Sequence, residues 1–354
     1  MSFVCANENM AEESFHRKDV AKNILPFGVS FLDDALVGIF PDDLILLGAP
    51  TGVGKTQLCV NIAMANMENG KKVHMIALEA SQFEIERRLK YQQVAECFFK
   101  DPQRPKLSYH MDFTNWYLGR FDKEFAHYHE YVEKICSTGF SNLFTFYKAN
   151  KFDVSDLVLH FSSIADETDL IILDHVHYLD WDEPNDNRAI KEIAKTVREL
   201  AIVNQKPVIL IAHLRKKDRG NKELVAGVDE FHGSSDLVKI ATKVITVAPG
   251  DATDDNKFIT YFRIPKNRMN GAVTRFIAAT AFDPKKGSYD DEYEISRAGV
   301  EKFQRVDDAK RPYWANRASA SFHSSGLPDS ESESFKNVTR KNAPKKVFNP
   351  SERY

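Results

Sequence analysis

The stretch LLGAPTGVGKTQ, residues 46–57, joins an apolar run (DLILLG) to an apolar-periodic segment (TQLCVNIAMANM) through a glycine-rich bend. A strand, such a bend and a helix that begins with Lys-Thr form the arrangement of a phosphate-binding loop. Glycines at 52 and 54 permit backbone angles and a close approach that side chains would forbid. The loop N–H groups can then point at phosphate oxygens beside the helix N-terminus. The sequence therefore predicts a nucleoside triphosphate site for ATP, or for another NTP or dNTP.

Two side chains of this loop have specific expected roles: Lys55 reaches the β- and γ-phosphates, and Thr56 ligates Mg²⁺. The strict pattern G-x-x-x-x-G-K-T begins at Ala49, because Gly48 lies one position too early. Alanine is the smallest substitute, so we expect the loop to be kept; the alternative is a chance glycine turn before a helix. The residues expected to bind nucleotide are Gly48, Ala49, Pro50, Thr51, Gly52, Val53, Gly54, Lys55, Thr56 and Gln57.

Length and composition favour one large α/β domain with additions. The chain has 354 residues, of which 43% are hydrophobic, enough for a sizeable core. A net charge of −3 excludes a wholly basic nucleic-acid coat, so any such contact must be a local patch. The four cysteines include no C-x-x-C pair, which excludes a zinc module and favours a reducing compartment. No signal peptide or membrane-length apolar run is present. We expect a soluble protein of the cytoplasm or nucleoid, in a phage-infected cell or a similar replisome, with no membrane partner.

Composition divides the chain into three parts. Residues 1–24 are polar with a short amphipathic stretch, and are either a frayed terminus or an arm that packs on a neighbouring subunit. Residues 25–302 alternate apolar runs with helical segments, which is typical of a mostly parallel central sheet flanked by helices. Residues 303–354 are rich in Ser, Asn and Lys and are expected to be a disordered polar tail, either solubilising or docking through its end. The expected strands are 43–48, 73–79, 143–147, 169–174, 207–213, 243–248, 258–265 and 273–281.

The segment from about 81 to 142 is long for one connection between strands. It is rich in aromatic and charged residues, and we expect inserted helices there. Its aromatic stripe is more typical of a core than of a base-stacking surface.

Hydrolysis requires a carboxylate that supports the metal and another that orients water. The run DLIILD ends in Asp174, the expected position for the metal-supporting carboxylate. The next residue is His175, so no Asp-Glu pair is present and the water-activating carboxylate must come from elsewhere. Glu79 follows the run KKVHMIAL; if this strand neighbours the loop strand, Glu79 faces the γ-phosphate and is the expected general base. Glu84 and Glu86 lie beyond it and are expected to be solvated.

A third apolar run, KPVILIAH, ends in His213, which could hydrogen-bond the γ-phosphate and report its loss. A histidine at a strand end is otherwise often structural. The basic segment that follows could grip nucleic-acid phosphates and move with hydrolysis, or could be a solvated charge run. Its charged residues are Arg215, Lys216, Lys217, Arg219 and Lys222.

Near the end of the expected sheet, FRIPKNRMNGAV places Lys266 and Arg268 on what is predicted to be a tight turn between two strands. A hairpin tip is poorly placed to reach the loop of its own subunit, but it can reach that of a neighbour. An arginine supplied across an interface neutralises transition-state charge. Catalysis would then depend on assembly.

With these parts in this order, the chain resembles the hexameric replicative helicases of the DnaB family. It looks closest to the helicase half of the phage primase–helicases and their mitochondrial relative Twinkle. The resemblance covers about residues 24–300 and is carried by GAPTGVGKT, ALEAS, LIILDHVHYL, LIAHLRKKDRG, FHGSSDLVKIATKVITV and IPKNRMNG. It implies a RecA-like P-loop NTPase core that forms a homo-oligomeric ring.

The resemblance also implies roles for particular residues. Lys55 and Thr56 would bind phosphate and Mg²⁺, Asp174 would support the metal and Glu79 would activate water. His213 would be the γ-phosphate sensor, where bacterial members more often have Gln, and Lys266 and Arg268 match the pair whose arginine acts in trans. The basic segment falls in the DNA loop of the ring channel, and EFHGSSDLVK (230–239), with Gly233 and Ser234, matches the second DNA segment. That segment has His232 where family members tend to have Arg or Lys.

The resulting prediction is an ATP-dependent replicative helicase that moves on single-stranded DNA and unwinds a forked duplex. The chain begins almost at the ATPase core, so primase, polymerase or loader functions are expected from separate polypeptides. The alternative is a RecA-like, nucleotide-switched ATPase that assembles on DNA or on itself without unwinding it. A small-molecule kinase is a third interpretation, which leaves the basic segment and Arg268 unexplained.

Overall fold

A ten-stranded sheet runs through the whole molecule in the order β10-β9-β8-β7-β6-β1-β5-β4-β2-β3. The computed structural model describes residues 5–107, 109–214, 224–227, 231, 235–298 and 302–306. The strands are β1 (Leu44–Ala49), β2 (Val73–Ala77), β3 (Leu143–Tyr147), β4 (Leu170–Asp174), β5 (Val208–His213), β6 (Lys243–Ala252), β7 (Phe258–Asn267), β8 (Phe276–Asp283), β9 (Ser288–Arg297) and β10 (Gln304–Arg305).

The six strands from β6 to β3 are parallel, and the four pairings from β6 to β10 are antiparallel. The central parallel strands β1, β4 and β5 are almost wholly buried, which explains their continuous apolar sequences. This arrangement confirms the predicted α/β fold with a mostly parallel sheet. The sheet order differs from the sequence expectation at one point, since β5 and β4 lie between β1 and β2.

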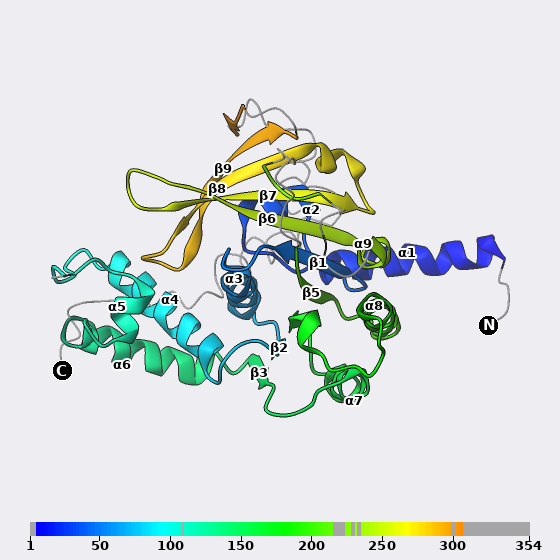
Figure 1. Ribbon diagram of the computed structural model, residues 1–354, viewed down its shortest axis with the longest axis horizontal. Helices are drawn as coiled ribbons and strands as arrows, with labels where there is room; N and C mark the ends of the chain where they lie inside the picture. Colours follow the sequence, from blue (N-terminus) through cyan, green and yellow to red (C-terminus); the bar gives the residue numbers. More distant parts are fainter. Residues whose placement is uncertain are drawn as a thin grey trace, which may run out of the picture.

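Helices cover both faces of the parallel half (Figure 1). The helices of the described residues are α1 (Ala6–Lys22), α2 (Ser30–Leu36), α3 (Lys55–Glu68), α4 (Glu84–Lys100), α5 (Phe113–Tyr117), α6 (Asp122–Gly139), α7 (Val154–Ile164), α8 (Asp186–Asn204) and α9 (Ser235–Ile240), with 3-10 turns η1 (Val176–Tyr178) and η3 (Gly271–Arg275). One apolar cluster joins α2 and α3 to one face of the sheet, and a second joins α7, α8 and α9 to the other face. Alternate residues of each strand therefore enter different clusters.

The segment between β2 and β3 forms a helical lobe of α4, α5 and α6, at the left of Figure 1. Its own core contains Phe98, Phe121, Phe125 and Tyr128, all nearly inaccessible. The rings of Phe98 and Phe125 meet edge to face, with their centroids 4.9 Å apart. The prediction that this aromatic stripe is core is therefore confirmed.

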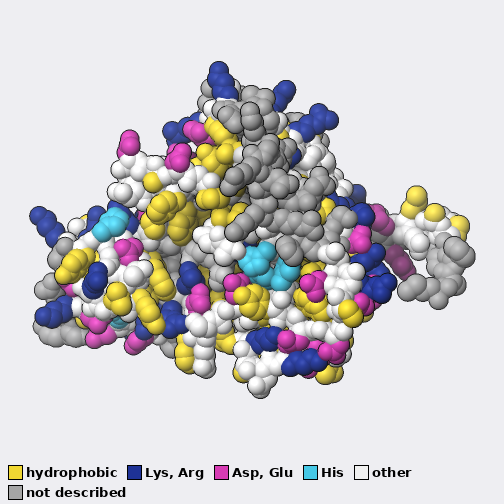
Figure 2. Space-filling model, in the orientation of Figure 1, with side chains coloured by type: hydrophobic (Ala, Val, Ile, Leu, Met, Phe, Trp, Pro, Cys, Tyr) yellow, Lys and Arg dark blue, Asp and Glu magenta, His cyan; other side chains and the backbone are white. Residues whose placement is uncertain are grey.

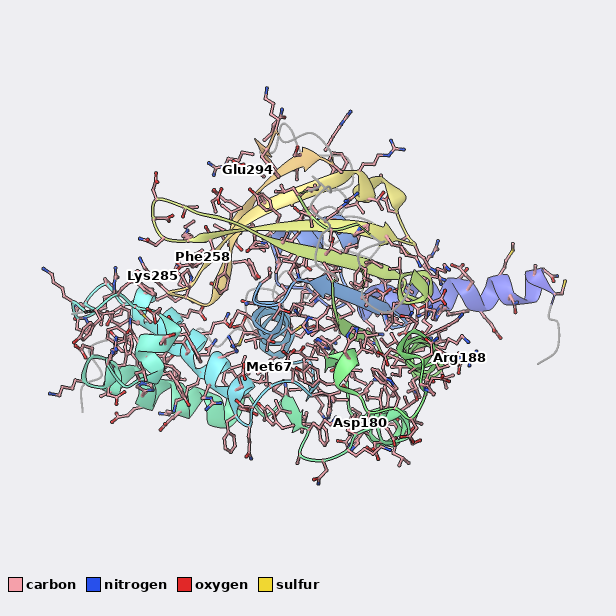
Figure 3. All side chains as sticks on the ribbon, in the orientation of Figure 1. Met67, Asp180, Arg188, Phe258, Lys285 and Glu294 are labelled. Atoms are coloured by element: carbon pink, nitrogen blue, oxygen red, sulfur yellow. The ribbon has the colours of Figure 1, made fainter. Side chains whose placement is uncertain are left out.

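The turn between β8 and β9, which contains Lys285, reaches across to this lobe (Figure 3). The Tyr91 hydroxyl of α4 donates to the carbonyls of Pro284 and Lys285, at 3.0 and 2.8 Å. Gln57 and Asn61 of α3 donate to the Gly287 carbonyl. This turn ties the antiparallel half to the helix that follows the phosphate loop.

Helix α1 projects away from the body of the protein, at the right of Figure 1. Its apolar side chains Met10 and Phe15 are 68% and 76% exposed. No helix among the described residues is long and apolar enough to cross a membrane.

Several local expectations differ from the structure: β2 ends at Ala77, and β6 and β7 continue to Ala252 and Asn267. The strand expected at 273–281 begins only at Phe276, because residues 271–275 form η3. Strands β9 and β10 are additional, and β10 lies in the segment expected to be a tail. The remaining residues of that segment, 307–354, lie outside the described part of the chain.

Candidate functional site

The phosphate loop leaves β1 and enters α3 with the geometry that its glycines predict. Gly52 and Gly54 have φ angles of +84° and +88°, in the left-handed region that favours glycine. Nothing lies within 4 Å of a Cβ built on Gly52. The loop residues Pro50, Thr51, Gly52 and Gly54 are exposed. The loop is therefore open to a ligand at the N-terminus of α3.

Gly48, by contrast, is a packing position within β1. A Cβ there would lie 2.4 Å from Cε1 of Phe231 and 2.8 Å from Cδ2 of Leu214. Ala49 also belongs to β1 and is fully buried. This packing gives a physical reason for a glycine one position before the strict motif.

The Lys55 side chain lies folded over the base of its own loop. Its ammonium donates to the carbonyls of Ala49 and Pro50, at 3.2 and 3.1 Å, and lies 3.1 Å from Nδ1 of His213. Burial lowers the pKa of Lys55, while the charges of Glu79 and Asp174 oppose this shift. An incoming phosphate would exchange these weak partners for charged oxygens.

Thr56 and Asp174 form the pair expected to hold the metal. The Thr56 hydroxyl donates to Oδ2 of Asp174 at 2.9 Å. Asp174 is 1% exposed, and its Oδ1 has no hydrogen-bond partner among the described residues. Burial raises the pKa of Asp174 to about 6. A buried carboxylate oxygen without a partner, beside a hydroxyl, fits Mg²⁺, which prefers oxygen ligands.

Glu79, His175 and His213 meet beside this pair, from the carboxyl ends of β2, β4 and β5. One candidate ligand atom from each lies within 4.8 Å of the others. Glu79 reaches this position although β2 does not neighbour β1, because the intervening strands end at the same edge. Figure 2 shows histidine side chains reaching the surface near the middle of this face, beside acidic side chains.

This trio does not fit a transition-metal site. Nδ1 of His175 accepts a hydrogen bond from the backbone N–H of His177 at 3.2 Å. A neutral imidazole that accepts at Nδ1 carries its proton at Nε2. The Nε2 atom that faces Glu79 therefore offers a proton and no lone pair. Burial and the neighbouring His213, His177 and Lys55 lower the pKa of His175 to about 3.

His175 is the residue of this site that the sequence did not reveal. The sequence marks it only as the replacement for the second acid of an Asp-Glu pair. The available signal was that His175 directly follows one apolar run and His213 ends another, and those runs are the adjacent strands β4 and β5.

Two acidic residues beyond Glu79 are not solvated as expected. Glu86 accepts hydrogen bonds from Thr145 and Tyr147 of β3. Glu84 pairs with Arg88 one turn along α4, at 2.9 Å. Glu86 therefore fixes α4 against β3, whereas the Glu84 pair stays within α4.

Gln57 has a structural contact in addition to its expected nucleotide contact. Its amide nitrogen donates to the Gly287 carbonyl at 2.9 Å, and Arg88 donates to its amide oxygen at 3.4 Å. Its side chain is thus held by the β8–β9 turn and by α4.

Lys266 and Arg268 lie nearer the start of β1, whereas the phosphate loop follows the end of β1. Lys266 belongs to β7, not to a turn, and its ammonium donates to the carbonyls of Val238 and Lys239 at the end of α9. The exposed Arg268 begins the connection to β8, and its backbone N–H donates to Thr242. Thr242 in turn donates to Leu44, where β1 begins. The expected tight turn is wrong, because η3 occupies this connection.

The residues expected to bind DNA lie outside the described part of the chain. They are Arg215, Lys216, Lys217, Arg219, Lys222, Gly233 and Ser234. Leu214 and Phe231, which border these two segments, form an isolated antiparallel bridge. The bridge brings one end of each segment together above Gly48.

Comparisons with known proteins agree with this fold. A "Probable plasmid replicative DNA helicase" of Chlamydia psittaci is 26% identical over 206 residues, which cover 56% of this chain and 41% of that protein. This chain thus spans about two fifths of the curated relative that it matches.

Two solved structures share the fold. One, described as an ATPase domain, matches with a TM-score of 0.67 and 19% identity, over 81% of this chain and 99% of that one. The other, a DnaB-like replicative helicase described with its interactions with primase, matches with a TM-score of 0.65 and 17% identity, over 81% and 67% of the two chains. The family described as DnaB-like helicase C terminal domain matches residues 25–283. The chain therefore belongs to the family of DnaB-like helicase C-terminal domains.

Proposed function

We propose that this protein is an ATP-dependent DNA helicase that works as a homo-oligomeric ring, a hexamer by its family. The ring would move on single-stranded DNA and unwind duplex DNA at a replication fork. Family membership and the assembled hydrolysis site support this proposal. One of the two similar structures is described as a helicase that interacts with primase. A primase, polymerase or loader in trans is therefore also proposed here.

The observation that carries the proposal is the split between the phosphate loop and Arg268. Val244 pairs with Leu46 of β1 on one side and with Lys266 on the other, and Arg268 lies level with Leu44. The loop begins after Ala49, at the other end of β1, roughly 16 Å away along the strand direction. An arginine so placed serves a neighbour's site, and not its own.

Each residue of the site has a proposed role. Lys55 binds the β- and γ-phosphates, while Thr56 and Asp174 hold Mg²⁺, which would neutralise phosphate charge. Glu79 accepts a proton from water as the water oxygen bonds to the γ-phosphorus. The bond from that phosphorus to the bridging oxygen breaks, and ADP keeps the electron pair. His213 contacts the γ-phosphate, and the neighbour's Arg268 stabilises the charge that develops.

Helix α1 supports assembly into a ring. It is a 17-residue helix on which Met10 and Phe15 are exposed, and most helical stability in proteins comes from packing of an apolar face. Packing on an adjacent protomer would bury Met10 and Phe15.

The bridge between Leu214 and Phe231 supports a route from nucleotide to DNA. His213 precedes one candidate DNA segment directly, and Phe231 borders the other. A shift of His213 on loss of the γ-phosphate would move both segments in the ring channel.

Mixed rings test the split site. Arg268→Ala should abolish DNA-stimulated ATP hydrolysis and leave nucleotide binding intact, and Lys55→Ala should abolish both. Because each variant supplies what the other lacks, mixing them should restore part of the hydrolysis. Absence of any restoration in rings shown to contain both variants would contradict the trans role of Arg268.

A strand-displacement assay on a forked duplex separates the helicase from a nucleotide-switched assembly ATPase. ATP-dependent release of the strand is the expected result. Binding and hydrolysis without displacement would favour the alternative.

A further inference from the structure

We propose that His175 is a positioning residue for the general base, which it orients by donating from Nε2 to the carboxylate of Glu79. The inference rests on the proposed function of Glu79. It assigns a role to His175, which has none of the catalytic roles proposed above.

The first support is the burial of His175. Its side chain is 0% exposed, directly after Asp174 and below the Glu79 carboxylate, which is itself 39% exposed. Nε2 of His175 is buried and has no hydrogen-bond partner among the described residues. An unsatisfied buried donor is costly, so one that persists needs a partner in some state of the protein.

The second support is the direction of the donor. The backbone N–H of His177 occupies Nδ1 of His175, so the proton resides on Nε2. The only acidic oxygen in its vicinity that the structure describes is Oε2 of Glu79, 3.8 Å away. A small rotation of the exposed carboxylate would close this gap to hydrogen-bond length, whereas the buried ring is fixed by its surroundings.

The third support is the contact of His175 with the candidate sensor. The rings of His175 and His213 meet edge to face, with centroids 3.8 Å apart. His213 also touches Lys55. His175 thus lies between His213, the proposed γ-phosphate sensor, and Glu79, the proposed general base. A movement of the His213 ring would therefore displace the His175 ring.

Together these contacts give His175 a defined task. When nucleotide draws Glu79 inward, Nε2–H fixes one carboxylate oxygen, and the other faces the attacking water. A correctly aimed base acts in the transition state and not in nucleotide binding, so kcat and not KM should respond.

Two substitutions of similar size separate positioning from packing. His175→Asn keeps an acceptor for the His177 N–H but has no donor that reaches Glu79. His175→Gln carries an amide N–H at about the place of Nε2. We expect His175→Asn to lower kcat of DNA-stimulated hydrolysis about 10- to 100-fold, the range for a hydrogen bond to a charged group. KM and the dissociation constant of a fluorescent ATP analogue should stay unchanged.

We expect His175→Gln to recover most of kcat. His110→Asn, the same change at an exposed histidine in the helical lobe, should leave kcat unchanged. Glu79→Asp shortens the side chain by one methylene and so moves the carboxylate away from Nε2 of His175. In the Glu79→Asp background, His175→Asn should therefore lower kcat much less than it does in the wild-type background.

The outcomes distinguish this inference from the proposed function. Equal losses in His175→Asn and His175→Gln, or a rise in KM with kcat unchanged, would overturn the positioning role. Wild-type kcat in His175→Asn, together with an inactive Glu79→Gln, would overturn it and leave the proposed function intact. An active Glu79→Gln would instead refute Glu79 as the base.

Discussion

The Cβ position of Gly48 lies 2.4 Å from Cε1 of Phe231, a distance that real Cβ atoms do not show. The strand that leads into the phosphate loop thus packs directly on the residue that borders a candidate DNA segment. The Leu214–Phe231 bridge lies at the same place. The strand before the phosphate loop and the residue beside the candidate DNA segment therefore share one contact that has no spare volume.

Gly48→Ala should destabilise the protein by about 1–3 kcal/mol, because the added methyl overpacks this contact. The midpoint of urea unfolding measures the loss. Phe231→Leu, which removes the atoms in conflict, should restore part of it in the double variant. Equal stability of Gly48→Ala and wild type would show that Phe231 moves away without cost.

Asp174→Asn should stabilise the protein in the absence of nucleotide and Mg²⁺ while it abolishes hydrolysis. Burial raises the pKa of Asp174 to about 6, so at higher pH the ionised carboxylate costs about 1–3 kcal/mol of folding free energy. Asparagine has no such charge and can still accept from Thr56. Thermal melts at pH 8 measure the difference.

The pH dependence of this effect provides its control. The folded pKa exceeds the unfolded value of 3.8, so the wild type loses stability as pH rises from about 4 to about 6. The advantage of Asp174→Asn should vanish below about pH 4 and reach its full size above about pH 7. A constant difference across this range would assign it to packing.

Phe15→Glu should dissociate the ring without unfolding the protomer. Phe15 is 76% exposed on α1, so its substitution should change protomer stability by no more than about 0.5 kcal/mol. Arg17→Gln makes the same change in net charge on the opposite side of the helix, and should leave assembly intact. Sedimentation velocity distinguishes ring from protomer. Intact rings in Phe15→Glu would show that α1 is not part of the interface between protomers.

Replacing Arg215, Lys217 and Arg219 with Ala should weaken binding to single-stranded DNA and flatten its salt dependence. Each phosphate contact contributes about 0.7 to the slope of log K against log salt, so three lost contacts lower it by about 2. Replacing the exposed Lys106, Lys123 and Lys151 is the matched control. An unchanged salt slope in the triple variant would show that these three residues do not contact DNA phosphates.

Much of the fold was predictable because its strands are buried on both faces. Continuous apolar runs identified β1, β4 and β5 to within one residue at each end. Strand β9 (SYDDEYEISR) was not predicted, because its apolar residues alternate with acidic ones on a partly exposed part of the sheet. Strand order was not predictable, since the pairing of β2 with β4 depends on crossovers that no local pattern records.

The site was predictable where a residue type is tied to a strand end. Lys55, Thr56, Asp174, Glu79 and His213 converge as the sequence suggested, although their chemical roles stay predictions. Contacts across the fold were not predictable. The Gly48–Phe231 packing and the Lys266 contact with α9 join residues far apart in the sequence, and neither follows from a local motif.

The distance between the phosphate loop and Arg268 has a genetic consequence. If Arg268 acts in the adjacent protomer's site, as proposed above, a protomer that lacks the guanidinium would keep its own nucleotide site and disable the adjacent one. In a cell that makes normal and altered copies together, the damage would then exceed the altered fraction. Such an allele would act dominantly, and its severity would rise with the share of altered copies.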